Sequence, residues 1–81
     1  MMTNKDIVFQ VMDNLNNGIY HGWEIENKVH SITYPKRPYI STVLKYVKLY
    51  CDISGAMFEC LNRTESKYKY VSGLKIAGAI L

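Results

Sequence analysis

Pro38-Tyr39-Ile40-Ser41-Thr42-Val43-Leu44-Lys45-Tyr46-Val47-Lys48-Leu49-Tyr50-Cys51 carries the clearest helical pattern in the chain. Successive residues of an α-helix are rotated by about 100°, so the apolar side chains of this stretch fall on one arc of roughly 120°. They are Ile40, Val43, Leu44, Val47, Tyr50 and Cys51. Pro38 suits the first position of a helix, because the N–H that proline lacks would have no partner there. The pattern predicts a helix over residues 38–51 with one face in a core.

The opposite side of this predicted helix carries hydroxyl groups, lysines and one tyrosine. They are Ser41, Thr42, Lys45, Tyr46 and Lys48. Donors and small groups are what can approach base edges and phosphates when a helix lies in the major groove of DNA. A single lysine on an exposed helix face is more often only a solubilising charge. The five side chains together therefore favour DNA binding more strongly than any one of them. Leu49 on the same side would contact a thymine methyl group or a protein.

The segment before this helix, residues 34–38, contains two prolines. Proline has no backbone N–H and pushes the preceding residue out of the helical region, so a turn is expected here. Lys36 and Arg37 lie in this turn, beside the N-terminus of the next helix. Backbone N–H groups and basic side chains together favour a bound phosphate at such a position.

A second helix is predicted over residues 22–32. Ile25, Val29 and Ile32 are spaced so that they share one helical face. Trp23 at its start is expected to anchor the core rather than to serve in a site.

A first helix is predicted over residues 3–16. Thr3 is a plausible N-cap, and Asp6 three residues later forms an imperfect capping box. Its apolar stripe consists of Ile7, Val8, Val11, Met12 and Leu15. Asn16-Asn17-Gly18 supplies the left-handed conformation that ends a helix, and Ile19-Tyr20-His21 is long enough for a short strand.

Residues 56–71 predict a β-hairpin after a turn at Asp52 to Gly55. Two short runs flank a polar connection of five residues, Asn62 to Ser66. In the second run two tyrosines alternate with two lysines, so one face can pack while the other is basic. The basic side chains of the hairpin are Arg63, Lys67 and Lys69.

The order of these elements is typical of an α+β winged helix-turn-helix domain, in which the helix after the turn enters the major groove and the hairpin, or wing, flanks it. His21-Gly22-Trp23-Glu24-Ile25 resembles the H-G-Y-x-I segment of PadR-type transcriptional regulators. Ser41-Thr42-Val43 with Tyr46-Val47 resembles the recognition helix of MarR-type and PadR-type proteins, and Tyr68-Lys69-Tyr70-Val71-Ser72 resembles their second wing strand. The resemblance implies a winged-helix fold and DNA binding.

The chain also departs from these families. PadR-type and MarR-type regulators dimerise through long terminal helices that often shape an effector pocket, whereas only ten residues, 72–81, follow the hairpin here. We therefore expect no small-molecule effector. The glycine-leucine usual after the recognition helix is replaced, since Gly55 is followed by Ala56-Met57. The apolar tail, which Ser72 could cap as a short helix, is expected to close the core or to support self-association.

Composition is consistent with a single folded domain over residues 1–81. Hydrophobic residues make up 48% and charged residues 21% of the sequence, which excludes disorder as the default state. The net charge of +3 is uneven: residues 1–35 hold two basic and four acidic side chains, whereas residues 36–81 hold eight basic and three acidic. The second part is therefore the one expected to face a polyanion. With no signal segment or apolar run long enough for a membrane span, we expect a cytoplasmic protein and no membrane partner.

Cysteine and histidine spacing favours neither a metal site nor catalysis. Two thiols, Cys51 and Cys60, are expected to be reduced, with a disulfide as the less favoured alternative. His21 and His30 lack the tight spacing that lets one turn present two zinc ligands. The sequence contains no paired-carboxylate motif, no glycine-rich phosphate loop and no nucleophile beside an evident base, so we expect neither an enzyme nor a cofactor.

These observations predict a small sequence-specific protein that binds double-stranded DNA, such as a transcriptional regulator encoded by a phage, plasmid or virus. A homodimer is expected, because two-fold dimers match palindromic half-sites. The expected DNA contacts are Lys36, Arg37, Tyr39, Ser41, Thr42, Lys45, Tyr46, Lys48, Arg63, Lys67 and Lys69. The alternative is a winged helix used for protein contact, as an adaptor or an inhibitor of a host enzyme.

Overall fold

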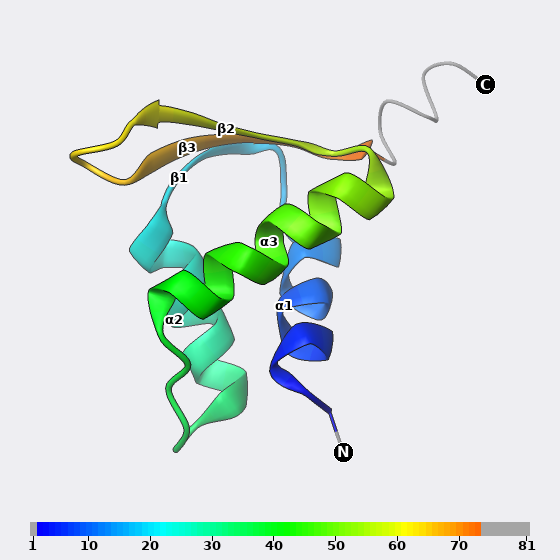
Figure 1. The fold of residues 1–81 in the computed structure, drawn as a ribbon, viewed down its shortest axis with the longest axis vertical. Helices are drawn as coiled ribbons and strands as arrows, with labels where there is room; N and C mark the ends of the chain where they lie inside the picture. The colour runs from blue at the N-terminus through cyan, green and yellow to red at the C-terminus, as the bar shows by residue number, and fades with distance from the viewer. Residues whose placement is uncertain (1, 74–81) are drawn as a thin grey trace.

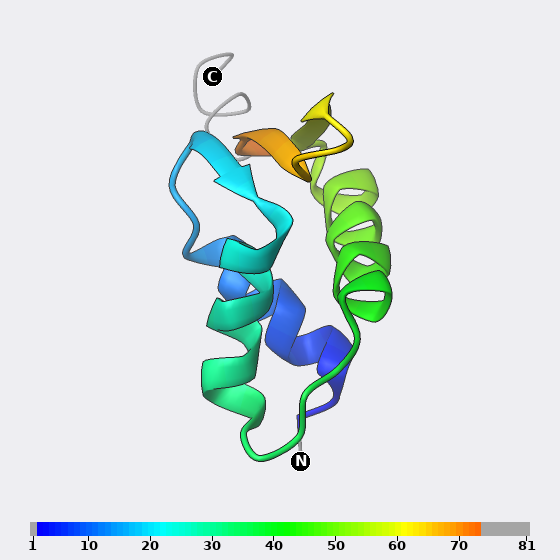
Figure 2. The same ribbon diagram turned by 90° about the vertical axis from the view of Figure 1, so that its left-hand side faces the viewer.

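The computed structural model describes residues 2–73, and this part of the chain forms an α+β domain, as expected. Its elements are α1 (Asn4–Asp13), β1 (Gly18–His21), α2 (Gly22–Thr33), α3 (Ile40–Ser54), β2 (Met57–Asn62) and β3 (Lys67–Val71) (Figure 1). The predicted short strand and hairpin are both present. They join into one sheet, which lies across one end of the three helices (Figures 1 and 2).

The sheet is antiparallel with the strand order β1-β3-β2, so β3 is the central strand. On one side of β3, His21 of β1 pairs with Lys67 and Gly18 pairs with Tyr70. On the other side, Phe58 of β2 pairs with Tyr70. Side chains of a strand alternate between the two faces, so Tyr70 and its neighbours two residues away point toward the helices. The core-facing side of the hairpin is therefore aromatic.

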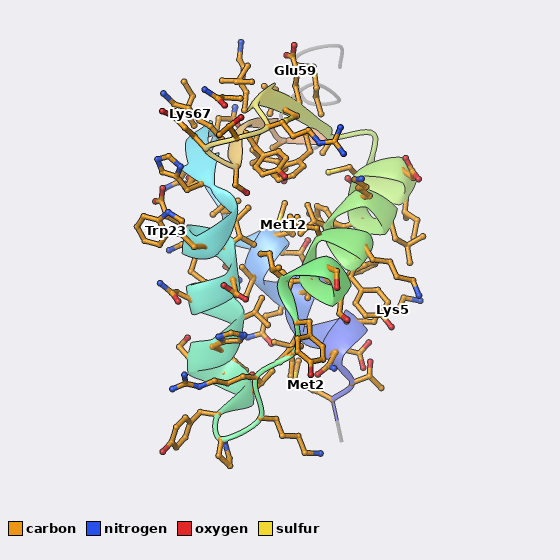
Figure 3. All side chains as sticks on the ribbon, turned by 60° about the vertical axis from the view of Figure 1, so that its left-hand side comes forward. Met2, Lys5, Met12, Trp23, Glu59 and Lys67 are labelled. Atoms are coloured by element: carbon orange, nitrogen blue, oxygen red, sulfur yellow. The ribbon has the colours of Figure 1, made fainter. Side chains whose placement is uncertain are left out.

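The core lies where the apolar stripes of the three helices meet β3. The largest fully buried side chains are Tyr70, Met12, Ile25, Val8, Val29, Val43 and Val47. Met12 of α1 lies in the interior of the molecule (Figure 3). Each helix contributes two of these residues and β3 contributes one, so the three helices and the central strand share one core.

Helix α1 begins as predicted and ends earlier. The Thr3 side chain accepts a hydrogen bond from the Asp6 N–H, and the Asp6 carboxylate accepts one from the Thr3 N–H, so the capping box is complete. The helix ends at Asp13 instead of residue 16. The Asn14 side chain donates to the Gln10 carbonyl at 2.9 Å, and such side-chain bonds compete with continuation of the helix.

Helix α2 corrects two predictions about burial. Ile25 and Val29 are fully buried, but Trp23 is 56% exposed and Ile32 is 44% exposed. Trp23 precedes Ile25 by two residues, a rotation of about 200°, so it points away from the buried stripe (Figure 3). Ile32 is on the buried side but in the last turn, where it lines surface hollows shared with α1.

Helix α3 spans Ile40–Ser54 rather than residues 38–51. Tyr39 is the N-cap residue, and the Pro38 carbonyl outside the helix lies 2.9 Å from Nε2 of His30. The helix continues through the turn-prone residues after Cys51, because Gly55 is the residue that adopts the left-handed conformation, with φ of 77°. Of the six predicted core positions four are buried; Ile40 is 36% exposed, and Leu44 is half-buried.

Three remaining predictions concern the thiols, the tail and membrane insertion. Cys51, which is buried, and Cys60, which is exposed, are both free thiols. The predicted tail lies outside the described residues except for Ser72 and Gly73, of which Ser72 donates its N–H to the Asn17 side chain at 2.8 Å. Among residues 2–73 no helix has the length and apolar character needed to cross a membrane.

Candidate nucleic-acid interface

Helix α3 carries five of the eleven side chains that the sequence predicts to contact DNA. Ser41, Lys45 and Lys48 are exposed, whereas Thr42 and Tyr46 are half-buried. Tyr46 packs partly against the core, and the Lys45 ammonium lies 5.6 Å from the centre of its ring. This face is hollowed along the helix by a shallow groove that is lined by Ser41, Leu44, Lys45, Lys48, Leu49 and Asp52.

A second groove separates α3 from the β2–β3 hairpin. We call it the α3–hairpin groove; its lining residues are Leu44, Lys48, Phe58, Cys60, Arg63 and Tyr68. Phe58 and Tyr68 stack with ring centres 4.5 Å apart and form part of its wall. Lys48 comes from α3 and Arg63 from the turn of the hairpin, so the fold brings two distant cations to one concave surface.

The hairpin lysines do not line this groove. The strand alternation that turns Tyr68 and Tyr70 toward the helices turns Lys67 and Lys69 to the opposite face of the sheet. Lys69 pairs there with Glu59 of β2, and Lys67 and Glu59 lie at the sheet end of the molecule in Figure 3. The two lysines and Arg63 therefore belong to different faces of the hairpin.

The turn between α2 and α3 forms a third basic region. Lys36 and Arg37 are exposed, and Tyr39 is 81% exposed. The Thr33 hydroxyl donates to the Lys36 carbonyl at 2.7 Å, which holds the turn in shape. This turn lies at the end of the molecule opposite the sheet (Figures 1 and 2). It is thus separated from the α3–hairpin groove by the length of the helices.

None of these basic groups is neutralised within the described residues. Over residues 2–73 the one pair within ion-pair distance is Glu26 with His30, at 3.9 Å. Asp52 is the acidic side chain in the groove along α3. Lysine and arginine side chains without an ion-pair partner among the described residues leave a positive potential over this surface.

The sequence reasoning missed a pair of aromatic side chains beside the hairpin. His21 and Trp23 stack with ring centres 5.7 Å apart and ring planes 11° apart. Trp23 had been expected in the core, although its offset of two residues from Ile25 already places it on the other side of a helix. The bond between His21 Nδ1 and the Glu65 carbonyl, 3.0 Å long, joins residues far apart in sequence and has no local signal.

Two further observations concern metal binding and the reactivity of the buried thiol. Within residues 2–73 no group of three or more His, Cys, Asp or Glu side chains is placed to hold a metal ion. Burial raises the pKa of the Cys51 thiol, which keeps it in the neutral form that is a poor nucleophile.

Comparisons with known proteins give no match. No family model, curated protein or solved structure is significantly similar to this chain.

Proposed function

We propose that this chain is a winged-helix domain that binds double-stranded DNA, with α3 in the major groove and the β2–β3 hairpin as the wing. The observation that carries this proposal is the α3–hairpin groove, in which Lys48 of α3 and Arg63 of the hairpin turn line one concave surface. The element order and the strand order β1-β3-β2 support it, because a helix after a turn, flanked by a hairpin, is the arrangement that winged-helix proteins use on DNA.

Each part of the surface has a role in this proposal. Ser41, Lys45 and Lys48 reach base edges and phosphates from the exposed face of α3. Arg63 contacts the flanking backbone or minor groove. The α2–α3 turn, with Lys36 and Arg37, reaches a more distant phosphate, and the lysines on the outer face of the sheet add only long-range attraction.

An electrophoretic shift with a pool of random-sequence duplexes tests the proposal. At about 50 mM salt the wild-type protein should shift the DNA, and Lys45→Glu with Lys48→Glu should weaken binding by tenfold or more, on the order expected for reversing phosphate contacts. Lys28→Glu reverses one charge at an exposed position of α2, as Lys45→Glu alone does on α3, and should have little effect. A missing shift, or equal effects of the α3 and α2 variants, would refute DNA binding through α3.

We further propose that the protein acts as a small cytoplasmic regulator of transcription that binds DNA as a homodimer without a small-molecule effector. One winged helix reads few base pairs, and a two-fold dimer doubles the site. Selection of bound fragments from random duplex DNA should return a palindrome. A non-palindromic motif, together with a monomeric mass in light scattering, would exclude the dimer.

The alternative function is contact with another protein. Leu49 and Ile53 are one helical turn apart on α3, and they are 36% and 67% exposed. Apolar side chains at such positions favour a protein partner when they form a patch. Loss of binding by Leu49→Ser and Ile53→Ser in a protein pull-down, with DNA binding unchanged, would support this function.

A further inference from the structure

The turn of the β2–β3 hairpin is attached to the start of α2. The β1–β3 ladder ends at the pair His21 and Lys67. Beyond it, the Gly22 N–H donates to the Ser66 carbonyl at 2.8 Å, and Nδ1 of His21 lies 3.0 Å from the Glu65 carbonyl. We call these two hydrogen bonds the turn anchor. The β1–β3 ladder holds the strands of the hairpin, and these two hydrogen bonds also hold its turn.

The turn anchor leads directly to Arg63. The Ser66 N–H donates to the Arg63 carbonyl at 3.2 Å, while the Ser66 carbonyl accepts from Gly22. Ser66 has a positive φ of 53°, which turns its carbonyl and its N–H toward these two partners. Two hydrogen bonds through Ser66 thus connect the backbone of Arg63 to Gly22, the first residue of α2.

The approach between the turn and α2 is close. A Cβ atom at Gly22 would lie 2.6 Å from the Ser66 hydroxyl oxygen, so the backbone at Gly22 and the Ser66 side chain are in close contact. Gly22 is buried although it lies at the end of a helix. The hairpin turn therefore contacts the start of α2 through Ser66, while residues 62–65 of the turn are exposed.

His21 is itself held in place on two sides. Its backbone N–H donates to the Glu24 carboxylate at 2.9 Å, and its ring stacks on Trp23. A carbonyl oxygen only accepts hydrogen bonds, so Nδ1 of His21 must carry a proton in the turn anchor. The exposed Trp23 ring thus lies beside the imidazole that bonds the turn.

We propose that His21 is a positioning residue that sets the hairpin turn so that Arg63 faces Lys48 across the α3–hairpin groove. This inference rests on the proposed DNA binding and assigns His21 no contact with DNA. A turn held in its binding geometry before DNA arrives loses less conformational entropy on binding than a free one. Removing the His21 side chain should therefore weaken the contribution of Arg63 and leave that of Lys45 intact.

Binding measurements on four single variants and two double variants test this role. His21→Ala should weaken DNA binding by about threefold to tenfold, the cost of ordering one or two side chains. His21→Asn should restore affinity, because the asparagine amide can donate from nearly the position of Nδ1. His21→Ala combined with Arg63→Ala should be little weaker than Arg63→Ala alone, whereas its combination with Lys45→Ala should show the product of both losses.

His30→Ala serves as the matched control, since it removes the other histidine side chain that is bonded to a backbone carbonyl, that of Pro38. Its effect should multiply with that of Arg63→Ala. The inference is wrong if His21→Ala and Arg63→Ala also act independently, or if His21→Asn binds no better than His21→Ala.

Amide hydrogen exchange separates this inference from the proposed function. Without any DNA, His21→Ala should speed the exchange of the Ser66 and Gly22 amides and leave the central amides of α3 unchanged. Unchanged exchange at the turn would refute the positioning role even if the protein binds DNA. Faster exchange at the turn in a protein that fails to bind DNA would refute the proposed function alone.

Discussion

At the scale of single residues, Tyr50 illustrates how a polar group is accommodated at the edge of the core. It is 8% exposed, its ring packs edge-on against Phe9 at 5.3 Å, and its hydroxyl donates to the Asp13 carboxylate at 2.7 Å. Burial and the neighbouring carboxylate of Asp13 both raise the pKa of Tyr50, because both disfavour the charged phenolate. The bond ties the middle of α3 to the end of α1.

Removing this hydroxyl group should destabilise the fold. Tyr50→Phe should lower the free energy of unfolding by about 1 kcal/mol, the usual net value of such a hydrogen bond. Urea denaturation measures the change. Tyr39→Phe is the matched control, because Tyr39 is 81% exposed and should tolerate the change within about 0.5 kcal/mol. Equal midpoints for the two variants would contradict a stabilising role for the Tyr50–Asp13 bond.

The capping carboxylate of α1 should make stability depend on pH. Hydrogen bonds from Thr3 lower the pKa of Asp6 below its ordinary value of 3.8. A lowered folded-state pKa means a contribution that is complete above the unfolded-state pKa and is lost as the pH falls through the folded-state value. The contribution should therefore begin to decline below about pH 4 and be lost at lower pH, as the folded-state carboxylate is protonated. Thermal midpoints measured from pH 7 to pH 2 should fall more for the wild type than for Asp6→Asn, which keeps an acceptor but no charge.

At the scale of elements, the end of α3 depends on one residue. Asp52, Ile53 and Ser54 remain helical although turn-prone residues among them predicted an earlier end. Gly55 ends the helix in the left-handed conformation, and its N–H donates to the Cys51 carbonyl at 2.9 Å. The weak turn preference of residues 52–54 thus does not end the helix, whereas the positive φ of Gly55 does.

Substitution at Gly55 should measure that requirement. No atom lies within 4 Å of a Cβ built there, so the cost of Gly55→Ala comes from the backbone alone. We expect a loss of about 1 kcal/mol in unfolding free energy, and a smaller loss for Gly55→Asn, because asparagine tolerates positive φ better. Equal losses for the two variants in urea denaturation would argue against backbone strain as the cause.

At the scale of the whole molecule, only some of the basic side chains lie at the grooves along α3. The basic groups of the proposed interface fall into three regions: the exposed face of α3 with the α3–hairpin groove, the outer face of the sheet, and the α2–α3 turn at the far end. The molecule is 41 Å long, so a contact with all three would need an extended or bent polyanion. The proposed DNA complex uses the first region fully and the other two in part.

The salt dependence of the DNA-binding constant should report the number of phosphate contacts. If about six phosphates are neutralised, the logarithm of the binding constant should fall with the logarithm of salt concentration with a slope of about −5. Fluorescence anisotropy with a selected duplex gives this slope. Arg63→Ala or Lys48→Ala should reduce its magnitude by about one, and Lys28→Ala should leave it unchanged. A slope near zero would exclude an interface built on phosphates.

Much of the fold and part of the site were predictable from local patterns. The core positions of α3 at Val43 and Val47, the capping box at Thr3 and the alternation of Tyr68 and Tyr70 with lysines follow from helical and strand periods. These features depend on neighbours within four residues along the chain, and such neighbours are visible in the order of amino acids.

The sequence by itself determined which residues form helices and strands and which of their faces are apolar. Only the tertiary structure decided that Lys48 and Arg63 line one groove, that Lys67 points to another face, and that His21 bonds the turn at Glu65. The physical reason is distance along the chain. His21 and Glu65 are 44 residues apart, and no local period can report a contact that depends on how whole elements pack.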